Sequence, residues 1–320
     1  ELMLLQEPKP KKKNIDFNRK SLIESSLLTV IGVIFILIGT YVPFLSFLSL
    51  FTSVPVIITT YRNKMYYGLL SAVTTTVILG FFIHPITAFS ALLVFLIPGV
   101  CIGFFMREKR PAFESVFYGF LAMTFTTVVF MQVLSLFLSI DILDSILAIL
   151  RESLNLQYEM IKEIPNVKKP NVEEILSSVK LFFPSIIIGS TLLMSFLNYY
   201  MSALIIRRTG DKNHVASITE FSMPGNISLG VLIIYLLTLV SGYFNYPYYE
   251  TLVLNMAAIF ILLFFLQGIA VIGYFFKHAK LNKSAKTIYI LLLIVLLPVS
   301  SFISIIGFAD AVFNFRRLKR

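Results

Sequence analysis

The chain has 320 residues, of which 57% are hydrophobic and only 14% are charged, and its mean hydropathy is +0.85. Soluble domains carry about 25% charged residues, so this composition excludes an ordinary soluble protein. The net charge of +10 indicates basic loops on the cytoplasmic side of a membrane rather than nucleic-acid binding. Several apolar runs reach the roughly 18 to 20 residues that a membrane-spanning helix needs. Because the runs are continuous rather than alternating, they predict an all-α polytopic bundle of about eight transmembrane helices.

We expect residues 1–20 to form a basic cytoplasmic tail, without a cleavable signal peptide. Residues 21–140 are predicted to form an N-terminal membrane bundle of five apolar segments, at about 22–42, 44–60, 65–83, 86–106 and 113–139. The second segment is short and contains Pro55, so we expect it to be tilted or broken. Gly99 and Gly103 lie on one face of the fourth segment and favour close helix packing over a ligand role.

The segment 141–178 is a long polar stretch between apolar runs. Its leucines and isoleucines recur at steps of three and four, which predicts an amphipathic helix: Leu143, Leu147, Leu150, Leu154, Ile161 and Ile164. Pro165 ends this helix, and Asn171 is the predicted N-cap of a second helix that continues into the next span. Seven acids and four bases place the segment outside the cell. We expect an extracytoplasmic helical hairpin whose apolar stripe covers a pocket, the membrane surface or a partner protein.

Residues 179–320 are predicted to form a C-terminal membrane bundle and a basic tail, with spans at about 179–206, 227–244 and 251–276. A further apolar run covers 288–308. A ninth simple crossing would place the basic end of the chain outside, against the positive-inside rule. Either the run breaks at Pro298 and Gly307 and returns as a re-entrant hairpin, or the first two segments are not two full crossings. The span count and the side of the C-terminus therefore stay open.

Glu250 is the preferred functional residue among the polar groups near lipid. It follows Tyr246, Tyr248 and Tyr249 and precedes Asn255. Aromatic faces with one carboxylate suit a cationic or amphipathic ligand, although an interfacial aromatic belt with a solvated carboxylate explains the same pattern.

Other polar residues predict structure rather than chemistry. Asp310 is expected to make a structural salt bridge or helix-end contact with Arg316 or Arg317. The sequence contains no HExxH, CxxC or GxxxxGK[ST] motif, and its single cysteine, Cys101, lies in an apolar run. We therefore predict no catalytic residue, no metal site and no cofactor, and an intramembrane enzyme is the least favoured function.

Three stretches together are similar to a known family. They are 54–62 with Gly68 beyond it, 198–208 followed by 221–224, and 307–317. In order and spacing they resemble the YybS-like family of uncharacterised bacterial membrane proteins, found mainly in Gram-positive bacteria. The membrane part of that family looks similar to the substrate-binding components of energy-coupling-factor transporters. The resemblance implies a small-molecule pocket that opens outward, and a membrane coupling protein packed against Ser25 and Thr29.

Two functions follow as hypotheses. The first is a multi-pass cell-membrane protein, with a cytoplasmic N-terminus, that binds or transports an unknown small molecule from the extracytoplasmic side. The hairpin helix with Leu147, Leu150 and Leu154 would be its lid, and a partner ATPase module or an ion gradient would supply the energy. The second is a non-transporting scaffold that recruits envelope or signalling partners through segment 141–178. The expected partners include the lipid bilayer and exclude nucleic acid.

Overall fold

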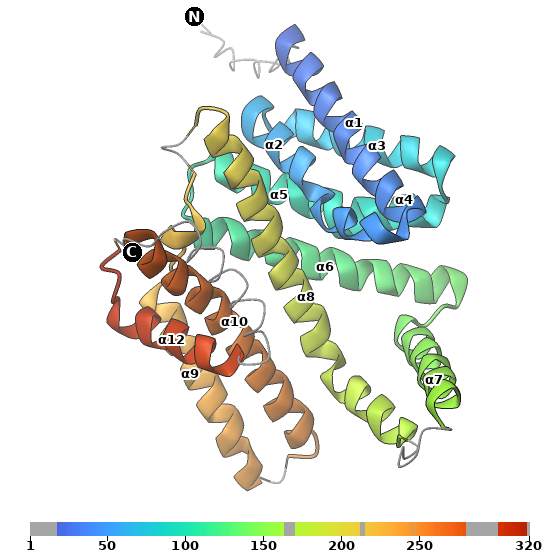
Figure 1. Ribbon diagram of the computed structural model, residues 1–320, viewed down its shortest axis with the longest axis vertical. Helices are drawn as coiled ribbons and strands as arrows, with labels where there is room; N and C mark the ends of the chain where they lie inside the picture. Colours follow the sequence, from blue (N-terminus) through green and yellow to red (C-terminus); the bar gives the residue numbers. More distant parts are fainter. Residues whose placement is uncertain (1–17, 163–169, 212–214, 245, 280–299, 319–320) are drawn as a thin grey trace, which may run out of the picture.

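The computed structural model describes residues 18–162, 170–211, 215–244, 246–279 and 300–318. Every element within these ranges is a helix (Figure 1). Eight helical segments in the described part of the chain are long and apolar enough to cross a membrane, which confirms the predicted all-α polytopic bundle. The predicted tail up to residue 17, the turn with Ile164 and Pro165, and the break at Pro298 lie outside the described residues.

Five crossing segments form the N-terminal half, and several of them are interrupted. In order they are α1 (Arg19–Tyr41), η1 (Pro43–Phe51) with α2 (Ser53–Asn63), α3 (Met65–Phe82), α4 (Pro85–Ala91) with η2 (Leu92–Leu96) and α5 (Ile97–Arg107), and α6 (Ala112–Leu138). The second crossing changes from a 3-10 helix to an α-helix at Thr52. Pro55 lies in the first turn of α2, where its missing N–H group costs little. Residues 53–60 of α2 are all buried, so this helix is the centre of the N-terminal half.

The predicted close packing of the fourth segment occurs against α2. A Cβ atom at Gly99 would lie 3.2 Å from the Ser53 Cβ atom, and one at Gly103 would lie 2.6 Å from the Ile57 carbonyl oxygen. Only glycine lets the two backbones approach this closely.

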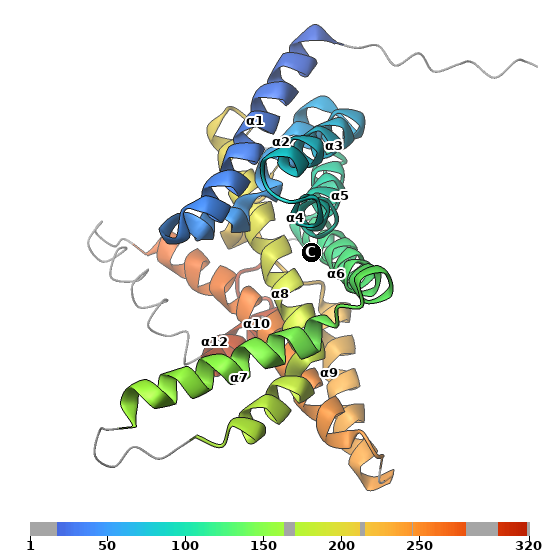
Figure 2. The same ribbon diagram turned by 90° about the vertical axis from the view of Figure 1, so that its right-hand side faces the viewer.

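Two helices follow the first half. The helix α7 (Ile142–Ile161) begins at Asp141, whose side chain accepts a hydrogen bond from the Asp144 amide. The helix α8 (Val172–Arg208) begins at Asn171, which caps it in the same way through the Glu174 amide. It runs without interruption from the polar segment into its membrane span. Figures 1 and 2 show α7 lying across the end of the bundle, beside the first turns of α8.

The C-terminal half packs on the other side of α8 (Figure 1). It contains η3 (Ile218–Glu220), α9 (Gly225–Val240), η4 (Ser241–Phe244), α10 (Tyr249–His278) and α12 (Ser300–Phe313). Arg316, just beyond α12, donates hydrogen bonds to the Thr219 and Phe221 carbonyl oxygens, which follow the basic end of α8. Arg316 therefore lies on the same side as Arg207 and Arg208. The break expected at Gly307 does not occur, because α12 continues through this residue.

The two ends of the bundle differ in net charge, although each carries both signs. Arg151, Lys162 and Lys180 lie at the end that is mainly acidic, and Glu24, Glu114, Asp211 and Glu220 lie at the end that is mainly basic. We call one the acidic end, defined by Asp141, Asp144, Glu152, Glu159, Glu173, Glu174 and Glu250. We call the other the basic end, defined by Arg62, Lys64, Arg107, Lys109, Arg110, Arg207, Arg208, Lys277 and Arg317. Successive spans connect these ends alternately, so the loop charges and the helix connections agree.

Candidate functional site

A groove of about 760 Å³ lies between α7 and the first turns of α8 at the acidic end. Both helices contribute charged and apolar side chains to it. The lining residues are Asp144, Leu147, Ala148, Arg151, Glu152, Asn155, Leu156, Glu159, Glu173, Leu176, Ser177 and Lys180. Ligand sites of small molecules commonly have volumes of about 300 to 1,000 Å³, so the groove is large enough for a metabolite-sized ligand.

One ion pair joins the two walls of the groove. The Arg151 Nη2 atom lies 2.9 Å from Glu173 Oε1, and the two side chains are 54% and 73% exposed. Exposed ion pairs contribute only about 0 to 1 kcal/mol. The walls can therefore separate at little energetic cost.

The groove combines a negative surface with an apolar floor. Four of its lining residues are acids and two are bases. Two of the acids already meet a base, since Glu173 pairs with Arg151 and Glu159 pairs with Lys162, whose pKa this contact raises. Leu176, which is 5% exposed, lies at the floor beside Leu147 and Ala148. This combination suits a ligand that carries a positive charge and an apolar part.

The predicted lid residues do not act together at this groove. Leu147 lines it, whereas Leu150 and Leu154 do not. The side of α7 that lines the groove is mixed, because Leu147, Ala148 and Leu156 lie among its charged residues. Arg151 pairs there with Glu173 of α8. No α7 side chain is buried. Leu147, Leu150 and Leu154 are each half-buried, but only Leu147 lines the groove, so a lid role for the three leucines stays a prediction.

The tyrosine-rich turn forms a second hollow at the acidic end, with a volume of about 510 Å³. Its lining includes Tyr246, Tyr248, Tyr249 and Glu250 of the predicted pocket, but not Asn255. The other lining residues are Leu181, Gly242, Pro247 and Thr251. Tyr246 and Tyr248 are 48% and 67% exposed, so the hollow is a surface feature. On α8, Lys180 lines the groove and Leu181 lines this hollow. No residue of α7 lines the hollow, so the predicted lid and the predicted pocket are two separate places.

Asn255 lines neither hollow and pairs with backbone groups of α8 beside Pro184. Pro184 has no N–H group and disrupts the hydrogen bonds of the preceding turn. The Asn255 Oδ1 atom accepts a 2.8 Å hydrogen bond from the Ser185 amide, and its Nδ2 atom donates to the Leu181 carbonyl oxygen at 2.8 Å. The residue is 8% exposed. Its position assigns it to the α8–α10 contact rather than to a ligand pocket.

Ser25 and Thr29 also face the interior of the chain. Each is 5% exposed, and the Thr29 and Ser71 hydroxyl oxygens lie 2.7 Å apart across the α1–α3 contact. Packing within this chain therefore occupies the surface that was expected to meet a coupling protein.

The structure brings Asp310 and Arg316 into a buried ion pair. The Arg316 Nη2 atom lies 2.8 Å from Asp310 Oδ2, and both side chains are fully buried. Gln267 of α10 donates a further 2.8 Å hydrogen bond to the same oxygen. Arg317, the other predicted partner, is exposed.

Sequence reasoning missed a polar network at the basic end that joins α1, α2, α5 and α8. Arg62 pairs with Glu24 at 2.6 Å and donates to the Thr209 hydroxyl. Tyr61 donates to Asp211, and Arg107 donates to the Tyr61 carbonyl oxygen at 2.9 Å. These residues are distant in sequence, so only the basic turn after α2 indicated that this region is polar. Among the described residues, no group of three or more histidine, cysteine, aspartate or glutamate side chains could hold a metal ion.

Comparisons with known proteins agree with this architecture. The profile of a family described as "Predicted membrane protein (DUF2232)" matches residues 30–311. The "Uncharacterized protein YybS" of Bacillus subtilis (strain 168) is 27% identical over 310 residues, which cover 93% of this chain and 97% of the relative. No solved structure matches the chain. Because the profile covers most of the eight-span bundle, the chain belongs to the DUF2232 family of predicted membrane proteins.

Proposed function

We propose that this integral membrane protein binds an amphipathic, positively charged small molecule in the α7–α8 groove. In this proposal the acidic end faces the extracytoplasmic side and the basic N-terminal end faces the cytoplasm, as the positive-inside rule predicts. The observation that carries the proposal is the groove of about 760 Å³, which joins four acids to an apolar floor.

The binding would rest on two contributions. Glu152 and Glu159 lie on α7 facing the groove and offer carboxylates to a cationic group. Leu156 and the buried Leu176 offer apolar surface to the remainder of the ligand. Opening of the Arg151–Glu173 bridge would admit the ligand.

The lining of the groove favours binding over catalysis, because it offers carboxylates but no nucleophile in contact with a base. Any transport step would draw energy from a partner ATPase module or an ion gradient, because the sequence has no phosphate-binding loop. A scaffold remains the second candidate.

The test uses the full chain in lipid nanodiscs and a fluorescent alkylammonium probe, with signal from empty nanodiscs subtracted. We expect saturable binding to the wild type. The double variant Glu152→Gln/Glu159→Gln should bind more weakly by up to about 30-fold, because two exposed charge contacts contribute below about 1 kcal/mol each.

Glu250→Gln is the matched control, because it removes an exposed acid of the same end outside the groove. Equal probe affinity for the wild type and the double variant would refute the groove. If only Glu250→Gln lowers the probe affinity, the binding site is the tyrosine-lined hollow rather than the groove.

A further inference from the structure

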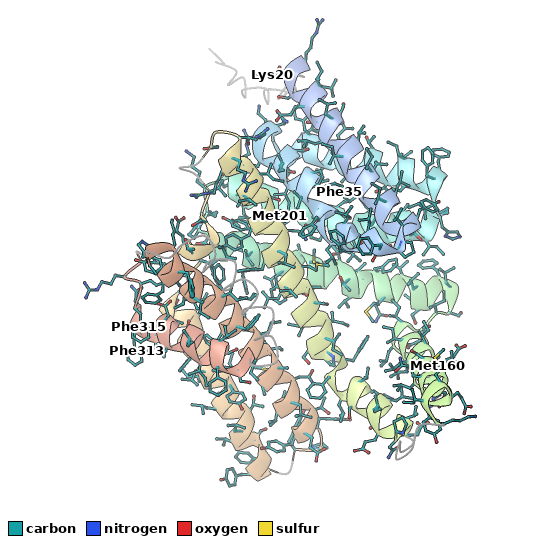
Figure 3. The ribbon with its side chains drawn as sticks, viewed as in Figure 1. Lys20, Phe35, Met160, Met201, Phe313 and Phe315 are labelled. Carbon is teal, nitrogen blue, oxygen red and sulfur yellow. The ribbon has the colours of Figure 1, made fainter. Side chains whose placement is uncertain are left out.

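The helix α7 exposes apolar side chains on the side that does not line the groove. Ile149 is 68% exposed and Met160, labelled in Figure 3, is 83% exposed. Ile146 is 42% exposed and lies three residues before Ile149, on the same face of the helix. We call Ile146, Ile149 and Met160 the outer stripe. A stripe of this kind in water would be unfavourable, so it requires an apolar partner.

The outer stripe continues a surface that already faces lipid. The membrane-spanning helix α6 ends at Leu138, and its last turn exposes Leu136 and Phe137 by 77% and 79%. Ile140, between the two helices, is 40% exposed. Lipid-facing side chains thus extend from the end of α6 to the beginning of α7.

Chain length keeps the start of α7 near the membrane. Four residue steps separate Leu138 from Ile142, and an extended chain spans at most about 3.6 Å per residue, or roughly 14 Å. The interfacial region on each side of the hydrocarbon core is about 5 to 7 Å thick. Because α7 runs across the end of the bundle in Figure 2, beside the first turns of α8, its axis can remain close to this region.

The polar residues of α7 lie on a different side of the helix from the outer stripe. Glu152, Asn155 and Glu159 line the groove toward α8, so the charged side of the helix does not have to enter lipid. Amphipathic helices that lie on membranes bury the apolar face about 5 to 10 Å into the boundary between headgroups and acyl chains.

We infer that α7 lies in the membrane interface at the acidic end, with the outer stripe in contact with the acyl chains of that leaflet. The occupant of the stripe is the bilayer, rather than a second copy of the chain or a partner protein. The acids on the polar face give no attraction to anionic headgroups, so burial of the apolar stripe drives the contact. One edge of the α7–α8 groove then borders the lipid, which gives amphipathic molecules from the leaflet direct access to it.

The absence of tryptophan from the sequence allows a direct test with single tryptophans in the full chain. Ile149→Trp places a fluorophore on the outer stripe, and Asn155→Trp places one on the polar face of the same helix. Both variants are reconstituted in phosphatidylcholine nanodiscs, with and without brominated acyl chains, and are also titrated with iodide. The Ile149→Trp emission should lie at shorter wavelength and lose most of its intensity to brominated lipid. The Asn155→Trp emission should respond to iodide instead.

Two results would overturn the inference. Quenching of Ile149→Trp by iodide but not by brominated lipid would place the stripe in water. Protection from both quenchers would show that protein, either a second copy or a partner, covers it. Met160→Trp provides a second position on the stripe if Ile149→Trp does not fold, and it should give the same lipid quenching.

Discussion

The buried ion pair at the end of α12 gives the sharpest prediction of stability. Asp310 and Arg316 are fully buried, and the carboxylate accepts hydrogen bonds from the Arg316 Nε and Nη2 atoms at 3.1 and 2.8 Å. The pair fixes the end of the chain to the segment after α8, since Arg316 also donates to the Thr219 and Phe221 carbonyl oxygens. Removing one partner leaves the other charge buried without compensation.

Asp310→Ala should therefore lower the free energy of unfolding by about 3 to 5 kcal/mol, the usual cost of breaking a buried ion pair from one side. Gln267 would also lose its acceptor. The double variant Asp310→Ala/Arg316→Met should be less destabilised than the single variant, because no unpaired charge remains.

The measurement is reversible unfolding by SDS in mixed micelles, followed by the helical circular-dichroism signal. Arg317→Ala is the matched control, because this arginine is adjacent in sequence and exposed. Surface substitutions usually change stability by less than about 0.5 kcal/mol. If Asp310→Ala lowers the free energy of unfolding no more than Arg317→Ala does, the Asp310–Arg316 pair does not hold the end of the chain, and the prediction is refuted.

Two further predictions concern helix contacts in the membrane and use the same unfolding assay. Gly103→Leu should lower the free energy of unfolding by at least about 1 to 3 kcal/mol through overpacking, because the new Cβ atom would lie 2.6 Å from the Ile57 carbonyl oxygen. The control Gly230→Leu has open space around it and should be tolerated. Equal effects of the two substitutions would contradict the α2–α5 contact. Asn255→Ala removes two hydrogen bonds to α8 at the Pro184 kink and one to the Thr251 carbonyl oxygen within α10. It should cost about 2 kcal/mol, taking roughly 0.6 kcal/mol for each bond in a membrane. A cost near zero would show that water or the backbone repairs the kink without the amide.

Local patterns in the sequence predicted much of the fold. Long apolar runs gave the eight spans, since backbone groups in lipid must pair within a helix. Asp141 begins α7 and Asn171 begins α8 because short polar side chains satisfy the first free amides of a helix. Gly99 and Gly103 marked the close contact of α5 with α2, since small residues alone permit it.

The predicted site depended on contacts that a sequence pattern does not contain. The amphipathic period of α7 shows that the helix has two faces, but the packing of α7 beside α8 decides which residues line the groove. Leu147 lines it while Leu150 and Leu154 do not.

The amino-acid sequence by itself determined that this is a helical membrane protein, where its helices begin and end, and which of its ends is acidic. Only the tertiary structure decided that Asn255 supports the kink of α8, that Ser25 and Thr29 face inward, and that the chain ends beside the basic turns. These results depend on partners 42 to 97 positions apart. Local propensity acts over a few residues, whereas such pairs form only when whole helices pack.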